Sequence, residues 1–470
     1  MYIVILGAGT VGIQLARQLI AENKDVALIE HDADKAQDTA SMLDCIVIND
    51  EGNNLDSLLK AGIDKADVFV SVTASDETNL IACGLVSAEF PHVKTIARVR
   101  NIDYSRTKMI SHSFLGIDHV INPEIEAAKI ISYAITHGAN SEIMLFENAS
   151  LQMRDLTIKS GSMFVNKDLK TIRKEHDFSF LVAAIMRNDS FIIPSGDTRI
   201  LENDQIYFLS TAEGFETIFR MEFKERKELN KVLIVGGGHI TTYVADLLLS
   251  REENPSLKED PLVVEGGKKK KGKGKKQIHI IERDLKTCDE LAKRYPQAMI
   301  THADITEDHF QEEEYLDGQD LLVCATNNQE LNLITSIYAK TKGVKKALAL
   351  VKRNSYRTMA RNLAVDMTVC LNDTVVNTIL KHIRNGNIKN VHALPGGRLE
   401  VIEFRVSEES SLQGKSISKI KLPANSLIIF ISRDGQDIIP TGDTIVRQED
   451  HLVMILERKS IARIEALISG

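Results

Sequence analysis

The sequence predicts an α/β protein made of two tandem copies of one unit, in which a doubly wound parallel sheet precedes a small α+β domain. Three observations carry this prediction: the chain repeats itself, each copy alternates short apolar runs with amphipathic stretches, and each copy opens on a glycine-rich turn. Such alternation calls for parallel strands joined by crossover helices. At 470 residues the chain is also too long for a single core.

The repeat is visible at several points. "IVILGAGTVG" at 3–12 returns as "VLIVGGGHIT" at 232–241, and "VSVTASDETNLI" at 70–81 returns as "VCATNNQELNLI" at 323–334. The second copy carries extra residues between its first two apolar runs, within a lysine-rich insert at 255–277. Two tandem copies of one two-domain unit explain the chain.

Each copy begins with a pattern typical of a Rossmann-like sheet. After the glycines, Ile13, Ala16 and Leu19 recur at helical spacing, and Val/Ile-rich runs then alternate with helical patterns. Six strands in that alternation suit a doubly wound sheet. In the first copy we expect strands at Ile3–Leu6, Val26–Glu30, Cys45–Ile48, Val68–Thr73, Thr95–Val99 and His119–Ile121.

The second part of each copy has β-branched runs broken by Gly, Pro and Asp turns, and it predicts a small α+β domain. "PSGDT" at 194–198 is answered there by "PTGDT" at 440–444. We expect four domains, at 1–135, 141–224, 230–385 and 395–470.

Composition excludes several classes of protein. The formal net charge of −8 argues against nucleic-acid binding. No apolar run approaches the roughly eighteen residues that span a bilayer, and the N-terminus reads as a strand rather than a signal peptide. The five cysteines form no CxxC pair, which is typical of free thiols in a reducing compartment. We therefore expect a cytoplasmic protein.

Gly7, Gly9 and Gly12 form a GxGxxG turn between the first strand and its helix. Gly7 permits the tight turn, Gly9 allows a pyrophosphate to approach the backbone, and Gly12 allows close packing of helix and strand. The free N–H groups at the helix start would hold phosphates. Glu30, at the end of the second strand, would accept hydrogen bonds from an adenosine ribose. The alternative is a nucleotide-free sheet, and this context favours binding.

The second turn is less regular. Gly236, Gly237 and Gly238 are present and Glu282 supplies the carboxylate, but Thr241 stands where Gly12 stood. We expect its side chain to push helix and strand slightly apart. An empty second site is as good an interpretation as an occupied one.

The carboxyl ends of parallel strands face the ligand crevice, so the ends of strands four and five should line the site. Thr73 and Ala74 follow strand four, and Arg98 ends strand five, where it could clamp a phosphate. A surface salt bridge is an equally good role for Arg98. Its counterpart is Leu350, so the two sites cannot hold phosphate equally.

No catalytic or metal motif emerges. The sequence contains neither HExxH nor GxSxG, and its histidines show no metal-ligand spacing. The lysine run at 268–276 could dock on an anionic membrane or an acidic partner, but a solvated insertion is the favoured interpretation. The domain after each sheet is small for a substrate domain. A bound nucleotide is therefore interpreted as a signal rather than a reactant.

Together, the glycine turn with Glu30, "VSVTASDETN", "ARVRN" at 97–101 and the tandem duplication resemble the TrkA family. These are peripheral cytoplasmic subunits of bacterial Trk potassium uptake systems, built from RCK (or KTN) and RCK-C domains. The resemblance implies NAD(H), with ATP or ADP at the same sites, and no enzymatic activity. It also implies a ring beneath an integral-membrane K⁺-translocating subunit of the TrkH/TrkG type.

The resemblance also implies which residues bind the nucleotide. In the first copy they are Gly7, Ala8, Gly9, Thr10, Val11, Glu30, Thr73, Ala74 and Arg98. In the second copy they are Gly236, Gly237, Gly238, His239, Ile240 and Glu282. Two other functions stay open: a tandem NAD-dependent dehydrogenase, and a free nucleotide-sensing scaffold without a transporter.

Overall fold

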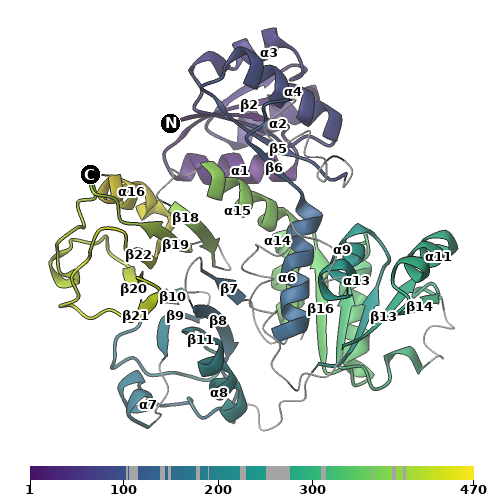
Figure 1. The fold of residues 1–470 in the computed structure, drawn as a ribbon, viewed down its shortest axis with the longest axis vertical. Coiled ribbons are helices and arrows are strands. Elements are labelled where there is room, and N and C mark those ends of the chain that lie inside the picture. Colours follow the sequence, from purple (N-terminus) through teal and green to yellow (C-terminus); the bar gives the residue numbers. More distant parts are fainter. Residues whose placement is uncertain are drawn as a thin grey trace. The chain divides into compact units, whose positions relative to one another are not determined.

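The computed structural model describes residues 1–470 except 102–103, 105–114, 138–142, 147–149, 176–179, 189, 223–228, 250–275, 308–313, 364, 384–387, 395–397 and 470. The chain divides into two compact units. The first unit combines Met1–Pro123 with Asn372–Gly470, and the second is Glu124–Leu371 (Figure 1). Each unit therefore holds a sheet from one copy together with parts of the other copy.

The first unit contains a six-stranded parallel sheet with the order β3-β2-β1-β4-β5-β6. Its strands are β1 (Tyr2–Leu6), β2 (Asp25–Glu30), β3 (Ile46–Asn49), β4 (Val68–Ser71), β5 (Lys94–Arg98) and β6 (His119–Ile121). Its crossover helices include α1 (Thr10–Ala21), α2 (Ala33–Met42), α3 (Leu55–Lys60) and α4 (Asp76–Glu89). The strand order reverses between β1 and β4, which places the glycine turn after β1 at the switch point of the sheet.

The second unit contains the matching parallel sheet, with the order β14-β13-β12-β15-β16-β17. Its strands are β12 (Lys231–Val235), β13 (Gln277–Glu282), β14 (Met299–His302), β15 (Leu321–Cys324), β16 (Lys346–Val351) and β17 (Met367–Cys370). Its helices include α9 (His239–Leu249), α11 (Leu285–Arg294), α13 (Gln329–Thr341) and α14 (Asn354–Asn362). All of the lysine-rich insert except Lys276 and Gln277 lies outside the described residues.

Each small domain is a five-stranded antiparallel sheet with helices. The first has the order β10-β9-β11-β8-β7 and the second has β18-β19-β22-β20-β21. The first comprises β7 (Ile143–Leu145), β8 (Leu151–Thr157), α7 (Leu169–Glu175), β9 (Leu181–Arg187), β10 (Ser190–Ile192), β11 (Gln205–Thr211) and α8 (Ala212–Glu222). The second comprises β18 (Ile388–Ala393), β19 (Leu399–Arg405), β20 (Ser426–Arg433), β21 (Gln436–Ile438), β22 (His451–Glu457) and α16 (Ile461–Ser469). The predicted fold class is confirmed.

Two helices stand apart from the sheet of their own copy. The helix α15 (Leu371–Ile383) belongs by sequence to the second copy, yet its apolar side packs into the core of the first sheet. In Figure 1, α15 runs alongside α1. This helix buries Val375, Val376, Ile379, Leu380 and Ile383 against side chains of α1, β1 and β4. Conversely, α6 (Pro123–His137) belongs to the first copy, and from Glu124 onward it lies in the second unit.

Polar contacts hold the second-copy elements onto the first sheet. Near the start of α15, Asp373 accepts a hydrogen bond from the Gln14 amide of α1 at 2.7 Å. At its other end, the Lys94 ammonium donates to the His382 carbonyl at 2.8 Å. The small domain that follows contributes Glu465, whose carboxylate lies 2.7 Å from the Lys24 ammonium. Residues from the end of the chain thus pack onto the first parallel sheet and belong to the same compact unit.

Candidate functional site

The first glycine turn is shaped by two glycines that no other residue could replace without movement. Gly7 has φ +105°, and a Cβ there would lie 3.2 Å from the backbone of Thr73. A Cβ on Gly12 would lie 1.9 Å from the Gly7 carbonyl oxygen, so the start of α1 packs directly on the turn. A Cβ on Gly9 would meet nothing within 4 Å. The turn therefore leaves open space at Gly9, where a ligand can approach the backbone.

The start of α1 offers backbone donors without a side-chain cap. Gly9 is the N-cap residue and contributes no capping hydrogen bond. Thr10 is exposed, whereas the side chain of Val11 is buried in the core, so Val11 can serve a ligand through its N–H group alone. Open N–H groups at a helix N-terminus attract anions.

Glu30 ties this turn to the end of β2. Its carboxylate is buried, and its Oε2 accepts the Ala8 N–H at 2.7 Å. The other oxygen accepts the Asp32 N–H at 3.1 Å and lies 2.9 Å from Nδ1 of His31. The turn, Glu30 and Thr73 are thus brought together. Because each carboxylate oxygen carries more than one lone pair, Glu30 retains capacity to accept a hydroxyl.

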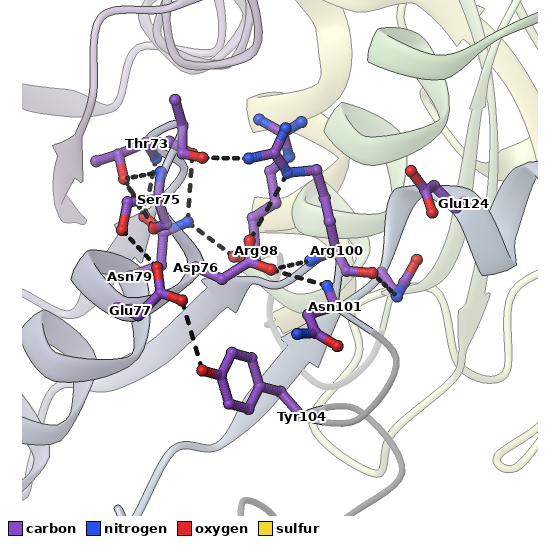
Figure 2. Close-up of polar contacts among 12 residues, drawn as sticks. Thr73, Ser75, Asp76, Glu77, Asn79, Arg98, Arg100, Asn101, Tyr104 and Glu124 are labelled. Carbon is purple, nitrogen blue, oxygen red and sulfur yellow. Dashed lines mark hydrogen bonds and ion pairs between the residues drawn. The ribbon is translucent and has the colours of Figure 1, made fainter. Parts of the chain in front are cut away.

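A buried asparagine organises the ends of β4 and β5 (Figure 2). The Asn79 Oδ1 accepts hydrogen bonds from the Thr73 N–H at 2.9 Å and from the Thr73 hydroxyl at 2.8 Å. Its Nδ2 donates to the Arg98 carbonyl at 2.8 Å. Asn79 is fully buried and also accepts from the Ser71 hydroxyl. This one side chain therefore sets the spacing between two predicted site residues, Thr73 and Arg98.

The loop after β5 is held by a second side chain of α4, also drawn in Figure 2. The Asp76 Oδ2 accepts the N–H groups of Arg100 and Asn101 at 2.9 and 2.8 Å. The Arg100 guanidinium donates to the Ala74 carbonyl. Ala74 thus contributes its backbone to loop structure, while Arg98 ends β5 as a half-buried side chain.

The second glycine turn repeats the main features of the first. Gly236 has φ +99°, and a Cβ there would lie 3.1 Å from the backbone at Ala325 and Thr326. Glu282 accepts the Gly237 N–H at 2.5 Å, and its other oxygen accepts the N–H groups of the two residues that follow it. A Cβ on Gly238 would again meet nothing within 4 Å.

The asparagine network recurs as well. The Asn332 Oδ1 accepts from the N–H and hydroxyl of Thr326 at 3.0 and 2.6 Å, and its amide donates to the Leu350 carbonyl at 2.9 Å. Leu350 itself is buried and apolar where the first copy has Arg98.

Thr241 changes how the second turn meets its helix. Its side chain is fully buried, and its hydroxyl donates to the Gly236 carbonyl at 2.5 Å. The first copy places Gly12 at this position, where a Cβ would be within 1.9 Å of the corresponding carbonyl. The second turn therefore accommodates the threonine through a hydrogen bond to the same carbonyl oxygen.

The start of α9 carries a contact with no counterpart at Thr10. His239 is the first residue of α9, and its Nδ1 lies 3.0 Å from Oε2 of Glu124 on α6. Ile240 is buried and, like Val11, can offer a ligand only its N–H group.

Comparison with known proteins identifies the family. The TrkA-N domain model matches residues 3–123 and 262–371, and the TrkA-C domain model matches 153–221 and 401–469. A Trk system potassium uptake protein TrkA homolog from Methanosarcina mazei is 30% identical over 471 residues, which cover 99% of either chain. The chain belongs to the TrkA family.

A second relative and one solved structure agree with this assignment. The Trk system potassium uptake protein TrkA of Halomonas elongata is 28% identical over 99% of this chain and 98% of its own. The structure of the GsuK channel bound to NAD matches 99% of this chain and 79% of its own, with a TM-score of 0.57 and 15% identity. This likeness concerns the fold: the TrkA chain and the GsuK channel share the same arrangement of helices and strands.

The structure completes the second TrkA-N domain. The family model begins its second match at 262, after the second glycine turn. The structure places β12 at the centre of the same sheet as β13 and β15, with α9 following its glycines. This TrkA chain therefore has two whole domains of this type, and in the second domain the insert separates the first two strands, β12 and β13.

Sequence reasoning missed two residues of the site network, Asn79 and Asn332. The repeat held a signal for them, because "DETNLI" and "QELNLI" place an asparagine at the same point of both copies. It also missed the contact of Glu124 with His239, for which the sequence of this TrkA chain holds no signal. Among the described residues, no group of three or more His, Cys, Asp or Glu side chains is placed to hold a metal ion. The helices of the described part include none long and apolar enough to cross a membrane.

Proposed function

We propose that this chain is the cytoplasmic regulatory subunit of a Trk-type potassium transporter and that nucleotides bound at its two glycine turns control K⁺ uptake. One observation carries the proposal: a member of the TrkA family repeats the same arrangement of glycine turn, buried glutamate and asparagine network in both copies. The repetition of a turn with open backbone donors favours binding over a purely structural role.

The ligand class follows from the two ends of each site. Glu30 and Glu282 sit at the ends of their second strands, where a carboxylate accepts ribose hydroxyls and repels a 2′-phosphate. The phosphates would meet the N–H groups at the starts of α1 and α9. NAD(H) fits both ends, and ATP and ADP share the same chemistry. The structural likeness to a channel bound to NAD supports this assignment.

We assign the binding residues as predicted from the sequence. In the first site they are Gly7, Ala8, Gly9, Thr10, Val11, Glu30, Thr73, Ala74 and Arg98. In the second they are Gly236, Gly237, Gly238, His239, Ile240 and Glu282. Arg98 ends β5 in the first copy, where the second copy has Leu350, so the first site should respond more to phosphate number.

Regulation requires that the nucleotide binds two shapes of the assembly with different affinity. A ligand shifts an equilibrium only by its differential affinity, and about 5.5 kcal/mol moves a population from 1:99 to 99:1. Several sites in a ring add their contributions. We propose such a ring on the inner face of the membrane, in contact with a K⁺-translocating subunit of the TrkH/TrkG type. No catalytic step is part of the proposal.

We also propose the division into four domains at 1–135, 141–224, 230–385 and 395–470. Limited proteolysis of the intact protein tests it. Early cleavage should fall at the three junctions between these domains and in the lysine-rich insert.

The function is tested on the purified full-length chain. Calorimetric titration with NAD⁺, NADH, ATP and ADP should give saturable binding, and pull-down from the native membrane should recover a multi-spanning K⁺ transport protein. NADH absorbance should stay constant with common carbonyl substrates. Sustained protein-dependent oxidation of NADH would favour a dehydrogenase, and failure to bind any of the four nucleotides would overturn the regulatory proposal.

A further inference from the structure

The second glycine turn is contacted by a carboxylate from a distant part of the sequence. Glu124 is the second residue of α6, a first-copy helix whose body lies in the second unit. Its Oε2 lies 3.0 Å from Nδ1 of His239. The Glu124 side chain is 24% exposed and that of His239 is 67% exposed.

His239 marks the phosphate end of the site. It directly follows the open Gly238 position and is the first residue of α9, where the first free N–H groups of the helix begin. A phosphate bound at those N–H groups would lie beside the His239 side chain. A carboxylate already on that side chain repels each phosphate charge, because like charges several ångströms apart interact even in a partly exposed site.

Within the described part of the first copy, no carboxylate makes this contact at the start of α1. The exchanged helix α15 also brings a carboxylate to the helix after the glycines, but Asp373 meets Gln14, one turn farther along α1. Thr10 occupies the position of His239. In β16 the second copy has Leu350 where the first copy has Arg98, so no guanidinium at this strand position offsets the added negative charge.

We propose that Glu124 is an internal competitor for phosphate at the second glycine turn. Its carboxylate lowers the affinity of that turn for phosphate-rich nucleotides, and a bound phosphate displaces Glu124 from His239. This regulation rests on the proposed function, since it acts on a nucleotide at the same site.

The energetics permit such an exchange. A partly exposed pair of this kind contributes about 0–1 kcal/mol, so it does not hold α6 against a multiply charged ligand. Two terms lower the affinity of the ligand: repulsion between its phosphates and the Glu124 carboxylate, and loss of the contact between Glu124 and His239. The effect should therefore grow from AMP to ADP to ATP, while binding of the adenosine end remains.

The test uses the intact chain and reads each copy separately. Photolabelling with azido-ATP, followed by quantification of labelled peptides from each copy, gives site-resolved affinities, and AMP, ADP and ATP serve as competitors. Glu124→Gln removes the charge while keeping the shape of the side chain. Glu126→Gln is the matched control, because it removes a carboxylate from the same helical turn, where Glu126 pairs with Lys129 at 3.0 Å.

We expect Glu124→Gln to raise the affinity of the second copy for ATP by about three- to tenfold, with a smaller rise for AMP and no change in the first copy. Glu126→Gln should leave both copies unchanged.

Three outcomes would count against the proposal. An unchanged ATP affinity in Glu124→Gln, with both copies still labelled, would overturn the competition alone. An equal rise in the ATP affinity of the second copy in Glu126→Gln would show that the general charge of α6 lowers the affinity. It would overturn the specific role of Glu124. If neither copy is labelled specifically, in the wild type or in either variant, the proposed nucleotide function itself would be overturned.

Discussion

Glu30 and Glu282 each hold the glycine turn that they would help to present to a nucleotide. Their carboxylates accept the backbone N–H of Ala8 or Gly237. The turn itself therefore holds each acceptor in place, so a ribose would meet an ordered group and little ordering entropy would be lost.

Replacing Glu30 tests this arrangement. We expect Glu30→Ala to weaken binding of adenine nucleotides at the first copy by about 1.5–3 kcal/mol, the range for a hydrogen bond to a charged group. Calorimetry or site-resolved photolabelling measures the change. Glu51→Ala, which removes an exposed carboxylate in the loop after β3, is the control and should bind normally. An affinity for Glu30→Ala equal to that of the control would remove Glu30 from the site.

Asn79 and Asn332 test the buried networks. Asn79→Ala leaves the polar groups of Ser71 and Thr73 and the Arg98 carbonyl without their shared partner. Such losses cost about 2–4 kcal/mol, which should lower the melting temperature of the affected unit by roughly 5–10 °C. Asn332→Ala should act equally in the other unit, whereas Asn53→Ala, on the surface, should not. A scanning calorimetry trace unaffected by Asn79→Ala would contradict this reading.

Residues with a distinct backbone or chemical signature could be predicted from the sequence, and those without one could not. Gly7 and Glu30 stand out because a positive φ and a strand-end carboxylate each demand a residue type. Asn79 stands out only through the repeat, which places an asparagine at the same point of both copies; its role depends on three simultaneous partners, Ser71, Thr73 and Arg98. Such partners exist only after β4, β5 and α4 have come together.

At the scale of elements, α15 packs its apolar side on the sheet of the other copy. Its last turn carries a histidine, His382, that stacks on a second histidine. His382 stacks on His119 of β6 with ring centroids 3.9 Å apart. Burial lowers the pKa of His382 to about 4, and the neighbouring His119, Lys94 and Lys381 add to the shift. A neutral imidazole is therefore favoured in the folded state.

The sign of the pH dependence follows from this shift. Between pH 6.5, the ordinary pKa of histidine, and pH 4, about the pKa of folded His382, the unfolded chain binds a proton that the folded His382 does not. Stability due to this group is thus present above pH 6.5 and is lost as pH falls toward 4. The melting temperature of the first unit should fall less steeply with acid in His382→Gln than in the wild type. His92→Gln, an exposed position, is the control. If the melting temperature falls equally steeply with acid in all three proteins, His382 is excluded as a source of the pH dependence.

The sequence predicts that α15 is amphipathic but not which sheet receives it. Val375, Val376, Ile379 and Ile383 follow helical spacing, and that pattern fits an apolar crevice on either sheet. The two sheets descend from one repeat, so their helix-binding faces resemble one another. Helical periodicity therefore predicts the element, whereas its placement depends on packing between copies.

At the scale of the whole molecule, the two copies are not two independent halves. The first unit needs residues from Asn372 onward, and the second unit begins at Glu124. A nucleotide bound at the first turn, as we propose, would lie on a domain whose core is closed by residues of the second copy. The helix α1, which begins at that turn, packs on α15, and α15 directly follows β17 of the second sheet.

Cutting the chain between the copies tests this dependence. A fragment of residues 1–225 lacks α15, and burial of the five apolar side chains of that helix contributes on the order of 10 kcal/mol, comparable to the whole stability of a typical domain. We therefore expect this fragment to aggregate or self-associate when expressed alone. Expressed together with residues 228–470, it should form a stable complex that elutes from a sizing column like the intact chain.

The control is the full-length protein after cleavage within the lysine-rich insert. Its melting profile should not change, because each unit keeps all of its described helices and strands. A monomeric 1–225 fragment that melts at the temperature of the intact protein would show that α15 is dispensable for the stability of the first sheet. The nucleotide affinities of the two proposed sites could then be compared in separate fragments.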